Sequence, residues 1–250
     1  MSRPGRTLDK RDHKRSGSKN PILSVKDLTV ELDGEKIIKD LFFEVRQGEI
    51  LVILGPNGAG KSVLLRTLLG VLPYRGEIRW REGIKIGYVP QRLPFIKDIP
   101  LSVREFFGLK KVPEKEMREI LNLLGVGDEI LEKNVGDLSS GQFQRILLGW
   151  GLVGNPQVLL FDEPLSGIDI SGQESIYDLL ENLRTEKNLT LLLVSHDLSV
   201  VYEFASNVLC LNKKSLCYGP PRRILTPKNL AQLYGGEVKF YKHFHRYGEQ

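Results

Sequence analysis

One eight-residue segment limits the possible folds of this chain more than any other feature. Residues 55–62 read GPNGAGKS and fit the phosphate-binding loop pattern G-x-x-x-x-G-K-[ST]. An apolar run at 49–54 predicts a β-strand just before the loop, and the leucines that follow Lys61 recur at helical spacing. A strand, loop and helix in this order surround phosphate oxygens with backbone N–H groups and the positive end of a helix. The segment therefore predicts an α/β core that binds a nucleoside triphosphate.

Side chains of the same loop complete the expected triphosphate site. The Lys61 ammonium is expected at the β- and γ-phosphates, and the Ser62 hydroxyl on Mg²⁺. Glycine has no side chain, so Gly58 and Gly60 let the backbone approach the phosphates closely. The residues expected to contact the nucleotide here are Gly55, Pro56, Asn57, Gly58, Ala59, Gly60, Lys61, Ser62 and Val63.

A second apolar strand, expected at 158–162, ends in two acidic residues. A carboxylate at the end of a buried strand is costly unless it faces a cation or an ordered water. Asp162 is therefore expected to order the Mg²⁺ shell, and Glu163 to polarise the attacking water as a general base.

Polar side chains follow two further strands of the expected sheet. Gln91 comes after the strand 84–89, and His196 comes after the strand 189–195. By itself each residue would usually be structural. Both nevertheless lie at carboxyl ends of parallel strands, which is the edge where open α/β sheets bind ligands.

The start of a predicted helix near residue 140 gives a second place for an anion. Ser139, Ser140 and Gly141 are small residues there, followed by Gln142. Such residues at a helix start expose N–H donors and a positive dipole end. In isolation the segment would be read as a helix cap, but its position between the glycine loop and Asp162 favours a functional role.

The alternation of strands and helices indicates an α/β fold with a P-loop NTPase core. We expect a mixed, mostly parallel sheet with helices on both faces. Strands at 22–32 and 35–46, joined by Asp33-Gly34, predict an N-terminal antiparallel β-subdomain. Residues from about 92 to 150 predict an inserted helical subdomain. The expected divisions are a basic tail at 1–20, an ATPase domain at 21–220 and a C-terminal extension at 221–250.

Together these segments resemble the ATP-binding subunit of ABC transporters, over residues 22 to about 220. The matching motifs are the Walker A loop at 55–62, the glutamine loop at 88–91, the signature at 138–142, the Walker B strand at 158–163, the D-loop at 166–169 and the switch histidine at 195–197. Residues 167–173, 194–198 and 208–212 look most like the ATPases of zinc and manganese importers.

The resemblance implies a role for each matching residue. Lys61 and Ser62 would hold phosphate and Mg²⁺, with Gln91 reaching the Mg²⁺ and the water. Glu163 would be the base, and His196 would touch the γ-phosphate. The signature residues Ser139, Ser140, Gly141 and Gln142 would close on ATP held by a second subunit, with Asp169 crossing that interface.

The resemblance also implies partners. Two copies would form a head-to-tail homodimer that closes on two ATP molecules and moves an integral-membrane permease, peripherally at the cytoplasmic face of the membrane. An extracytoplasmic solute-binding protein would take part indirectly. The implied cargo is zinc or manganese.

Three residues depart from the family pattern. Leu32 stands where an aromatic residue usually stacks on adenine, and Val63 replaces a threonine that contacts phosphate. Ser140 replaces the usual glycine of the signature, where a backbone angle open only to glycine would be strained. Because each catalytic group remains, we expect a working ATPase.

Composition argues against a nucleic-acid surface. The net charge of +5 is that of residues 1–20, which carry seven basic and two acidic residues, so the remaining body is neutral. A tail of this kind is typical of a solvated, disordered arm, with a contact to anionic lipid as the alternative.

Two cysteines, Cys210 and Cys217, are too few for a disulfide framework, and we expect reduced, partly buried thiols.

Alternative functions remain open at this point. The motifs do not select the cargo, so another small solute or export is possible for the same ATPase. A soluble ATPase acting on nucleic acid or ribosomes is disfavoured, because only 46 residues separate Gln91 from the signature and the body is neutral. His243 and His245 could bind zinc, but such a pair is more often surface decoration.

Overall fold

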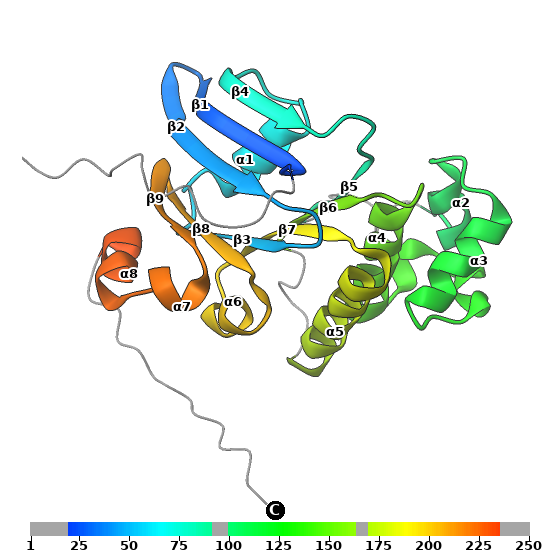
Figure 1. The fold of residues 1–250 in the computed structure, drawn as a ribbon. Helices are drawn as coiled ribbons and strands as arrows, with labels where there is room; N and C mark the ends of the chain where they lie inside the picture. Colours follow the sequence, from blue (N-terminus) through cyan, green and yellow to red (C-terminus); the bar gives the residue numbers. More distant parts are fainter. Residues whose placement is uncertain (1–19, 92–99, 164–169, 236–250) are drawn as a thin grey trace, which may run out of the picture.

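Two β-sheets and a set of flanking helices make up the chain in the computed structural model, which describes residues 20–91, 100–163 and 170–235 (Figure 1). The antiparallel sheet has the strand order β4-β1-β2, and the larger sheet has the order β9-β8-β3-β7-β6-β5. One parallel pair, Lys39 with Lys214, joins the two sheets through β2 and β9. The strands are β1 (Leu23–Leu32), β2 (Glu35–Val45), β3 (Ile50–Leu54), β4 (Arg75–Trp80), β5 (Ile86–Val89), β6 (Val158–Asp162), β7 (Thr190–Ser195), β8 (Asn207–Asn212) and β9 (Lys214–Gly219).

Helices cover both faces of the larger sheet, as the sequence predicts. On one face lie the helix α1 and the antiparallel sheet, and on the other face lie the helices α4, α5 and α6 (Figure 1). The helices are α1 (Lys61–Leu68), α2 (Val103–Gly108), α3 (Glu114–Leu123), α4 (Ser140–Leu152), α5 (Ile170–Lys187), α6 (Leu198–Phe204), α7 (Pro221–Ile224) and α8 (Pro227–Tyr234).

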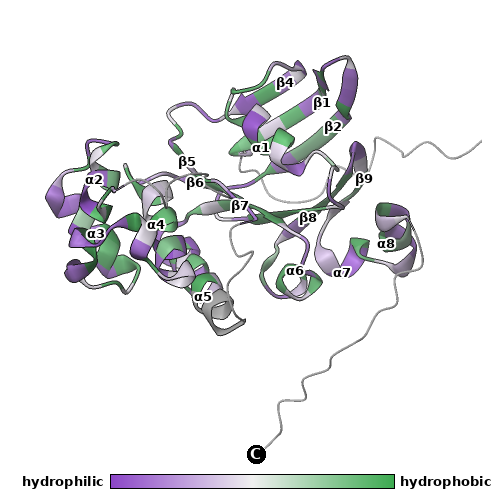
Figure 2. Cartoon of the chain, turned by 180° about the vertical axis from the view of Figure 1, so that it is seen from behind, coloured by the Kyte–Doolittle hydropathy of each residue, from purple (hydrophilic) through white to green (hydrophobic). Residues whose placement is uncertain are grey.

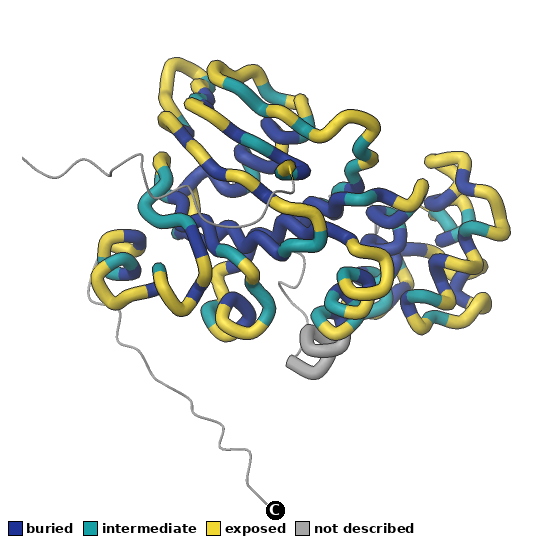
Figure 3. The backbone as a smooth tube through the Cα atoms, in the orientation of Figure 1, coloured by how far each residue is buried: buried dark blue, intermediate teal, exposed yellow. Residues whose placement is uncertain are grey.

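The three central strands are buried along their whole length. Each residue of β3, β6 and β7 is buried, and these strands form the hydrophobic middle of the molecule (Figures 2 and 3). Alternate residues serve opposite cores: Leu159 and Phe161 pack under α4 and α5, whereas Val158 and Leu160 pack under α1. A strand buried on both faces reads as a continuous apolar run, which is why these three could be recognised from the sequence.

The inserted subdomain is helical, with α2 and α3 at the end of the molecule remote from α7 and α8 (Figure 1). Ser102 caps α2 through the capping box expected with Glu105. An aromatic stack joins α2 to α4, because the rings of Phe106 and Trp150 lie 4.2 Å apart. Two short 3₁₀ segments, Asp128–Glu132 and Val135–Asp137, connect α3 to α4, and the sequence did not indicate them.

The expectation of reduced cysteines was wrong. Cys210 and Cys217 face each other across the antiparallel β8–β9 hairpin, with Cα atoms 4.9 Å apart, and they form a disulfide. Cysteine spacing alone does not reveal the register of a hairpin, and it is this register that brings the two thiols together.

Among the described residues, no helix is long and apolar enough to cross a membrane. The basic tail before residue 20, the D-loop at 166–169 and the pair His243 and His245 lie outside the described residues. The expected domain boundaries therefore stay predictions.

Candidate functional site

The glycine loop connects the end of β3 to the start of α1, as expected. Gly58 and Gly60 have φ angles of 77° and 95°, in the left-handed region that favours glycine. Gly60 caps α1, and its carbonyl accepts from Leu64 N at 2.8 Å. The first N–H groups of α1 have no partner within the helix, so this loop presents donors and a positive dipole end to an anion.

The β8–β9 hairpin braces the back of this loop. A Cβ atom added to Gly55 would meet the Leu211 carbonyl oxygen at 2.1 Å, so the two backbones are in direct contact. Lys213 N donates to the Ala59 carbonyl at 3.2 Å, and Lys39 N donates to the Lys213 carbonyl at 2.7 Å. The loop is therefore held by strands remote in the sequence as well as by its own glycines.

The Lys61 ammonium lies inside the loop and has three oxygen partners. Its Nζ donates to the Gly55 and Pro56 carbonyls at 2.9 and 3.1 Å, and lies 3.2 Å from Glu163 Oε1. Both members of the ion pair are largely buried, with side chains 7% and 15% exposed. A buried ammonium needs anionic or carbonyl partners, and phosphate oxygens are ligands of the same chemistry.

Asp162 and Ser62 meet where β6 ends beside α1. Ser62 Oγ donates to Asp162 Oδ1 at 2.9 Å, and Asp162 is only 3% exposed. Burial raises the pKa of Asp162 above its ordinary value, opposed by the Ser62 hydrogen bond. A hydroxyl and a carboxylate oxygen at this spacing form a hard-oxygen donor set, which suits Mg²⁺.

Glu163 also contacts the end of β5. Gln91 Nε2 donates to Glu163 Oε2 at 3.1 Å, so one carboxylate links Lys61 and Gln91. Glu163 itself has a φ of 42°, an uncommon conformation for a residue other than glycine. Of the residues predicted for the site, the structure thus brings together Lys61, Ser62, Gln91, Asp162 and Glu163.

His196 is exposed immediately after β7, and β7 lies between β3 and β6 in the sheet. It therefore shares the strand edge with the loop and with Asp162. The Ser195 hydroxyl accepts from Asp197 N at 3.1 Å, and Asp197 in turn caps α6 through Ser199 N. These bonds fix the backbone on both sides of His196.

The signature segment begins α4 in the helical subdomain. Ser139 is its cap, and a reciprocal pair of hydrogen bonds joins the backbone and side chains of Ser139 and Gln142. Ser140 is the first helical residue and is not among the described residues with positive φ, so the strain expected for its replacement of glycine is absent. Ser139 and Ser140 are exposed and available to a ligand from outside the subunit.

Two further residues, Tyr88 and Arg66, border the site, and the sequence assigned no role to either. Tyr88 on β5 faces the side of the sheet that carries Asp162, and Arg66 lies on α1 one turn after Ser62. Burial and the charge of Asp162 raise the pKa of Tyr88, and the charge of Arg66 opposes this shift. No local sequence pattern indicates them, because Tyr88 reaches this side of the sheet through the pairing of β5 with β6, in which it lies opposite Leu160.

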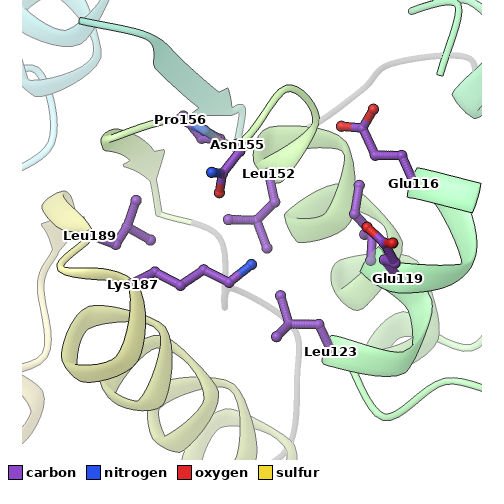
Figure 4. A pocket seen from close by; sticks show the side chains of 9 residues that line it. Glu116, Glu119, Leu123, Leu152, Asn155, Pro156, Lys187 and Leu189 are labelled. Atoms are coloured by element: carbon purple, nitrogen blue, oxygen red, sulfur yellow. The ribbon is translucent and has the colours of Figure 1, made fainter. Parts of the chain in front are cut away.

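A hollow of about 390 Å³ lies elsewhere, where α3 meets the ends of α4 and α5 (Figure 4). Lys187 extends toward Leu123 and Leu152, and Glu116 and Glu119 line the wall formed by α3 (Figure 4). Leu189 places this hollow at the amino end of β7, opposite the edge that carries His196. It contains no residue predicted for nucleotide binding.

The sequence of this chain matches one family profile and is similar to known proteins over most of its length. The family profile described as ABC transporter matches residues 38–166. A zinc import ATP-binding protein, ZnuC 1 of Hahella chejuensis, is 38% identical over 219 residues, which are 87% of this chain and 85% of that protein. ZnuC of Cereibacter sphaeroides is 38% identical over 228 residues, covering 89% and 93% of the two chains.

Solved structures agree on the fold. The cbiO1 subunit of Clostridium perfringens, part of the ABC transporter complex cbiONQ, superposes with a TM-score of 0.72 at 27% identity, covering 86% of this chain and 94% of that one. An ATP-binding cassette of an ABC transporter in its ADP conformation gives a TM-score of 0.76 over 88% of this chain and all of its own, and at 21% identity it supports the fold alone.

Proposed function

This chain belongs to the ABC transporter family as an ATP-hydrolysing subunit, and from this premise we propose that it powers the import of a divalent metal ion, zinc before manganese. The observation that carries the proposal is the full-length similarity to subunits named for zinc import. Such a subunit works with a membrane permease in a transporter complex. We place it peripherally at the cytoplasmic face of that permease, with an extracytoplasmic binding protein delivering the ion.

In this proposal the Lys61–Glu163 ion pair is exchanged when ATP binds. The Lys61 ammonium, 3.2 Å from Glu163, takes the β- and γ-phosphates as its anionic partners. The Glu163 carboxylate then accepts a proton from the attacking water. Gln91, already bonded to the Glu163 carboxylate, holds that carboxylate in orientation.

The hydroxyl of Ser62 and the carboxylate of Asp162 are the groups that would hold Mg²⁺. A bound Mg²⁺ would supply positive charge to offset the negative charge that develops on the phosphate oxygens. His196 contributes a ring nitrogen to the γ-phosphate from the adjacent strand end. The loop N–H groups around Gly58 and Gly60 bind the remaining phosphate oxygens.

Each subunit in this proposal holds two half-sites. The segment Ser139–Gln142 would bind the γ-phosphate of ATP held by a second copy, through the N-terminus of α4. Asp169 would contact the partner across the same interface. A head-to-tail homodimer closed by two ATP molecules is the expected active unit, and its closure would move the permease.

Replacing Glu163 by glutamine tests the mechanism. We expect the E163Q protein to hydrolyse ATP at least ~100-fold more slowly, because a general base contributes about 10²- to 10⁴-fold. ATP should remain bound, and dimers should accumulate in size-exclusion chromatography with light scattering. Glu186→Gln, on an exposed position of α5, is the matched control. Undiminished turnover in E163Q would refute the assigned role of Glu163.

The cargo needs its own experiment. The subunit should co-purify from membranes with a permease, and deletion of its gene should reduce uptake of radioactive zinc more than that of manganese. Complementation by the wild-type chain and not by E163Q would link uptake to hydrolysis. Normal uptake of both metals in the deletion strain would favour another solute or an exporter.

A further inference from the structure

The disulfide of the β8–β9 hairpin closes a ring of chain that includes the residues bracing the glycine loop. A Cβ atom added to Gly55 would meet the Leu211 carbonyl oxygen at 2.1 Å, and Lys213 N donates to the Ala59 carbonyl at 3.2 Å. Both bracing residues lie between the two cysteines in the sequence. The covalent link is therefore one residue away from the first of these contacts.

The hydrogen-bond ladder of the hairpin changes register beside the disulfide. Cys210 pairs with Cys217, but Leu211 pairs with Ser215, so Leu216 is an extra residue on β9. A bulge of this kind disrupts the ladder locally and leaves the extra residue unpaired. The covalent bond, between Cα atoms 4.9 Å apart, thus fixes the two strands where the backbone ladder is interrupted.

Cys210 also adjoins the point where the glycine loop begins. In the parallel pair β3–β8 it lies opposite Leu54, the last residue of β3, and Gly55 follows directly. The close approach of Gly55 to the Leu211 carbonyl leaves no room between the loop and the hairpin. Because close-packed backbone transmits displacement, we expect a change in the hairpin to move the loop.

The two sulfurs differ in accessibility. Cys210 is fully buried, whereas Cys217 is only partly buried, so a reductant reaches the Cys217 sulfur first. The subunit is proposed to work at the cytoplasmic face of a membrane, where thiols are kept reduced. A disulfide in such a compartment is usually transient and catalytic or redox-sensing. The position of this one, beside the phosphate loop, favours sensing.

We propose that the Cys210–Cys217 disulfide is a redox switch that sets the affinity of the glycine loop for ATP. The oxidised hairpin holds the loop in its binding geometry, and reduction loosens the brace and weakens binding. This inference rests on the proposed role of the loop in binding ATP.

The switching step is thiol–disulfide exchange with a dithiol. One thiolate of the dithiol attacks the Cys217 sulfur, the protein S–S bond breaks, and its electron pair leaves on the Cys210 sulfur, which takes a proton. The second thiolate then attacks the dithiol's own sulfur in the mixed disulfide and releases Cys217, which is protonated in turn. The protein gains two electrons and two protons, and the dithiol becomes a cyclic disulfide. The reverse reaction closes the hairpin again.

Linkage between the two equilibria gives the proposal a second, independent readout. If reduction weakens nucleotide binding by some factor, bound nucleotide must lower the equilibrium constant for reduction by the same factor. A hairpin that does not communicate with the loop would show neither effect.

The experiment equilibrates the wild type and a Cys217→Ser variant with mixtures of reduced and oxidised dithiothreitol. Titration with a fluorescent ATP analogue gives the affinity, and maleimide labelling with mass spectrometry counts the free thiols. The chain contains two cysteines in all, so the labelling reports on this pair alone. Ser102→Ala is the control for stability, because it removes the cap of α2 in the helical subdomain and leaves the hairpin intact.

We expect the reduced wild type to bind the analogue about 5- to 10-fold more weakly than the oxidised protein, near the lower end of the coupling found between linked sites. C217S should match the reduced wild type and should not respond to dithiothreitol. A saturating concentration of the analogue should raise the ratio of reduced to oxidised dithiothreitol needed for half-reduction by the same factor. S102A should bind like the wild type in both redox states.

Four results would overturn the proposal, and they differ in what they refute. Equal affinities of the oxidised and reduced wild type would show that the hairpin holds the loop without its disulfide. Two labelled thiols at every dithiothreitol ratio would show that the pair does not form the bond. Equally weak binding by S102A would assign the effect to general stability. No binding by either redox form would refute the role of the loop itself, and the inference about the disulfide would fall with it.

Discussion

Substituting alanine for Gly87 should destabilise the folded chain strongly, although the substitution adds only one methyl group. Gly87 lies in β5, and a Cβ atom there would be 2.0 Å from the Gly151 carbonyl oxygen of α4 and 2.9 Å from Leu159 Cδ1. A carbon and a carbonyl oxygen ordinarily stay about 3.4 Å apart, so the strand and the helix would have to separate by about 1.4 Å. The obstacle is backbone, which cannot rotate away as a side chain does.

The expected cost is about 3 kcal/mol, at the upper end of the range for overpacked cores. For a chain of this size, that corresponds to a fall in Tm of roughly 6–12 °C. Urea unfolding followed by circular dichroism measures the free energy, and differential scanning fluorimetry measures Tm. Gly108→Ala is the control, because the added Cβ at the end of α2 meets no atom within 4 Å. A G87A protein within about 0.5 kcal/mol of the wild type would refute the claim of direct backbone contact.

Three further predictions concern the loop, the signature and a buried phenol. Gly55→Ala should abolish binding of a fluorescent ATP analogue in equilibrium titrations, because its Cβ would lie 2.1 Å from the Leu211 carbonyl that braces the loop; normal binding would contradict the brace. Gly141→Ala meets no atom within 4 Å in the first turn of α4, so Tm should hold or rise while ATPase activity falls, and a loss of Tm would argue against that geometry. Burial raises the pKa of Tyr177 from 10 to about 12. The folded state favours the neutral phenol, so the contribution of Tyr177 to the free energy of unfolding is fully present below pH 10. It is lost as the pH rises through 12, by at most ~2.7 kcal/mol. The free energy of unfolding of the wild type should therefore fall relative to that of Y177F above pH 10, and a difference that does not depend on pH would contradict the shift.

The sequence was sufficient wherever the determining interactions are local. The loop 55–62 is recognisable because glycine positions and the adjoining strand and helix are encoded within twenty residues. The Ser102 and Ser139 caps depend on partners three residues away, and the structure has both. The hairpin of β1 and β2 follows from Asp33-Gly34 in the same way.

Sequence patterns were insufficient where the contact partner is distant in the chain. Leu211 and Lys213 brace the glycine loop from more than 150 residues away, and no local pattern indicates this. The disulfide of Cys210 and Cys217 depends on hairpin register, and the position of Tyr88 on the same side of the sheet as Asp162 depends on which strand neighbours which. These facts are properties of sheet order and register, which the chain settles only when the sheet assembles.

The contact at Gly87 connects the two halves of the proposed ATP machinery. The strand β5 leads directly to Gln91, which bonds the Glu163 carboxylate, and the helix α4 carries the signature at its first turn. Gly87 against the Gly151 carbonyl leaves no room between strand and helix, and Phe106 stacked on Trp150 adds a second contact to α4 from α2. Since close-packed backbone transmits displacement instead of absorbing it, we expect a movement of Gln91 to shift α4 and with it the segment Ser139–Gln142. A subunit that senses its own nucleotide through Gln91 would thus adjust the half-site that it offers to its partner, and G87A should weaken this coupling even at temperatures where the variant is fully folded.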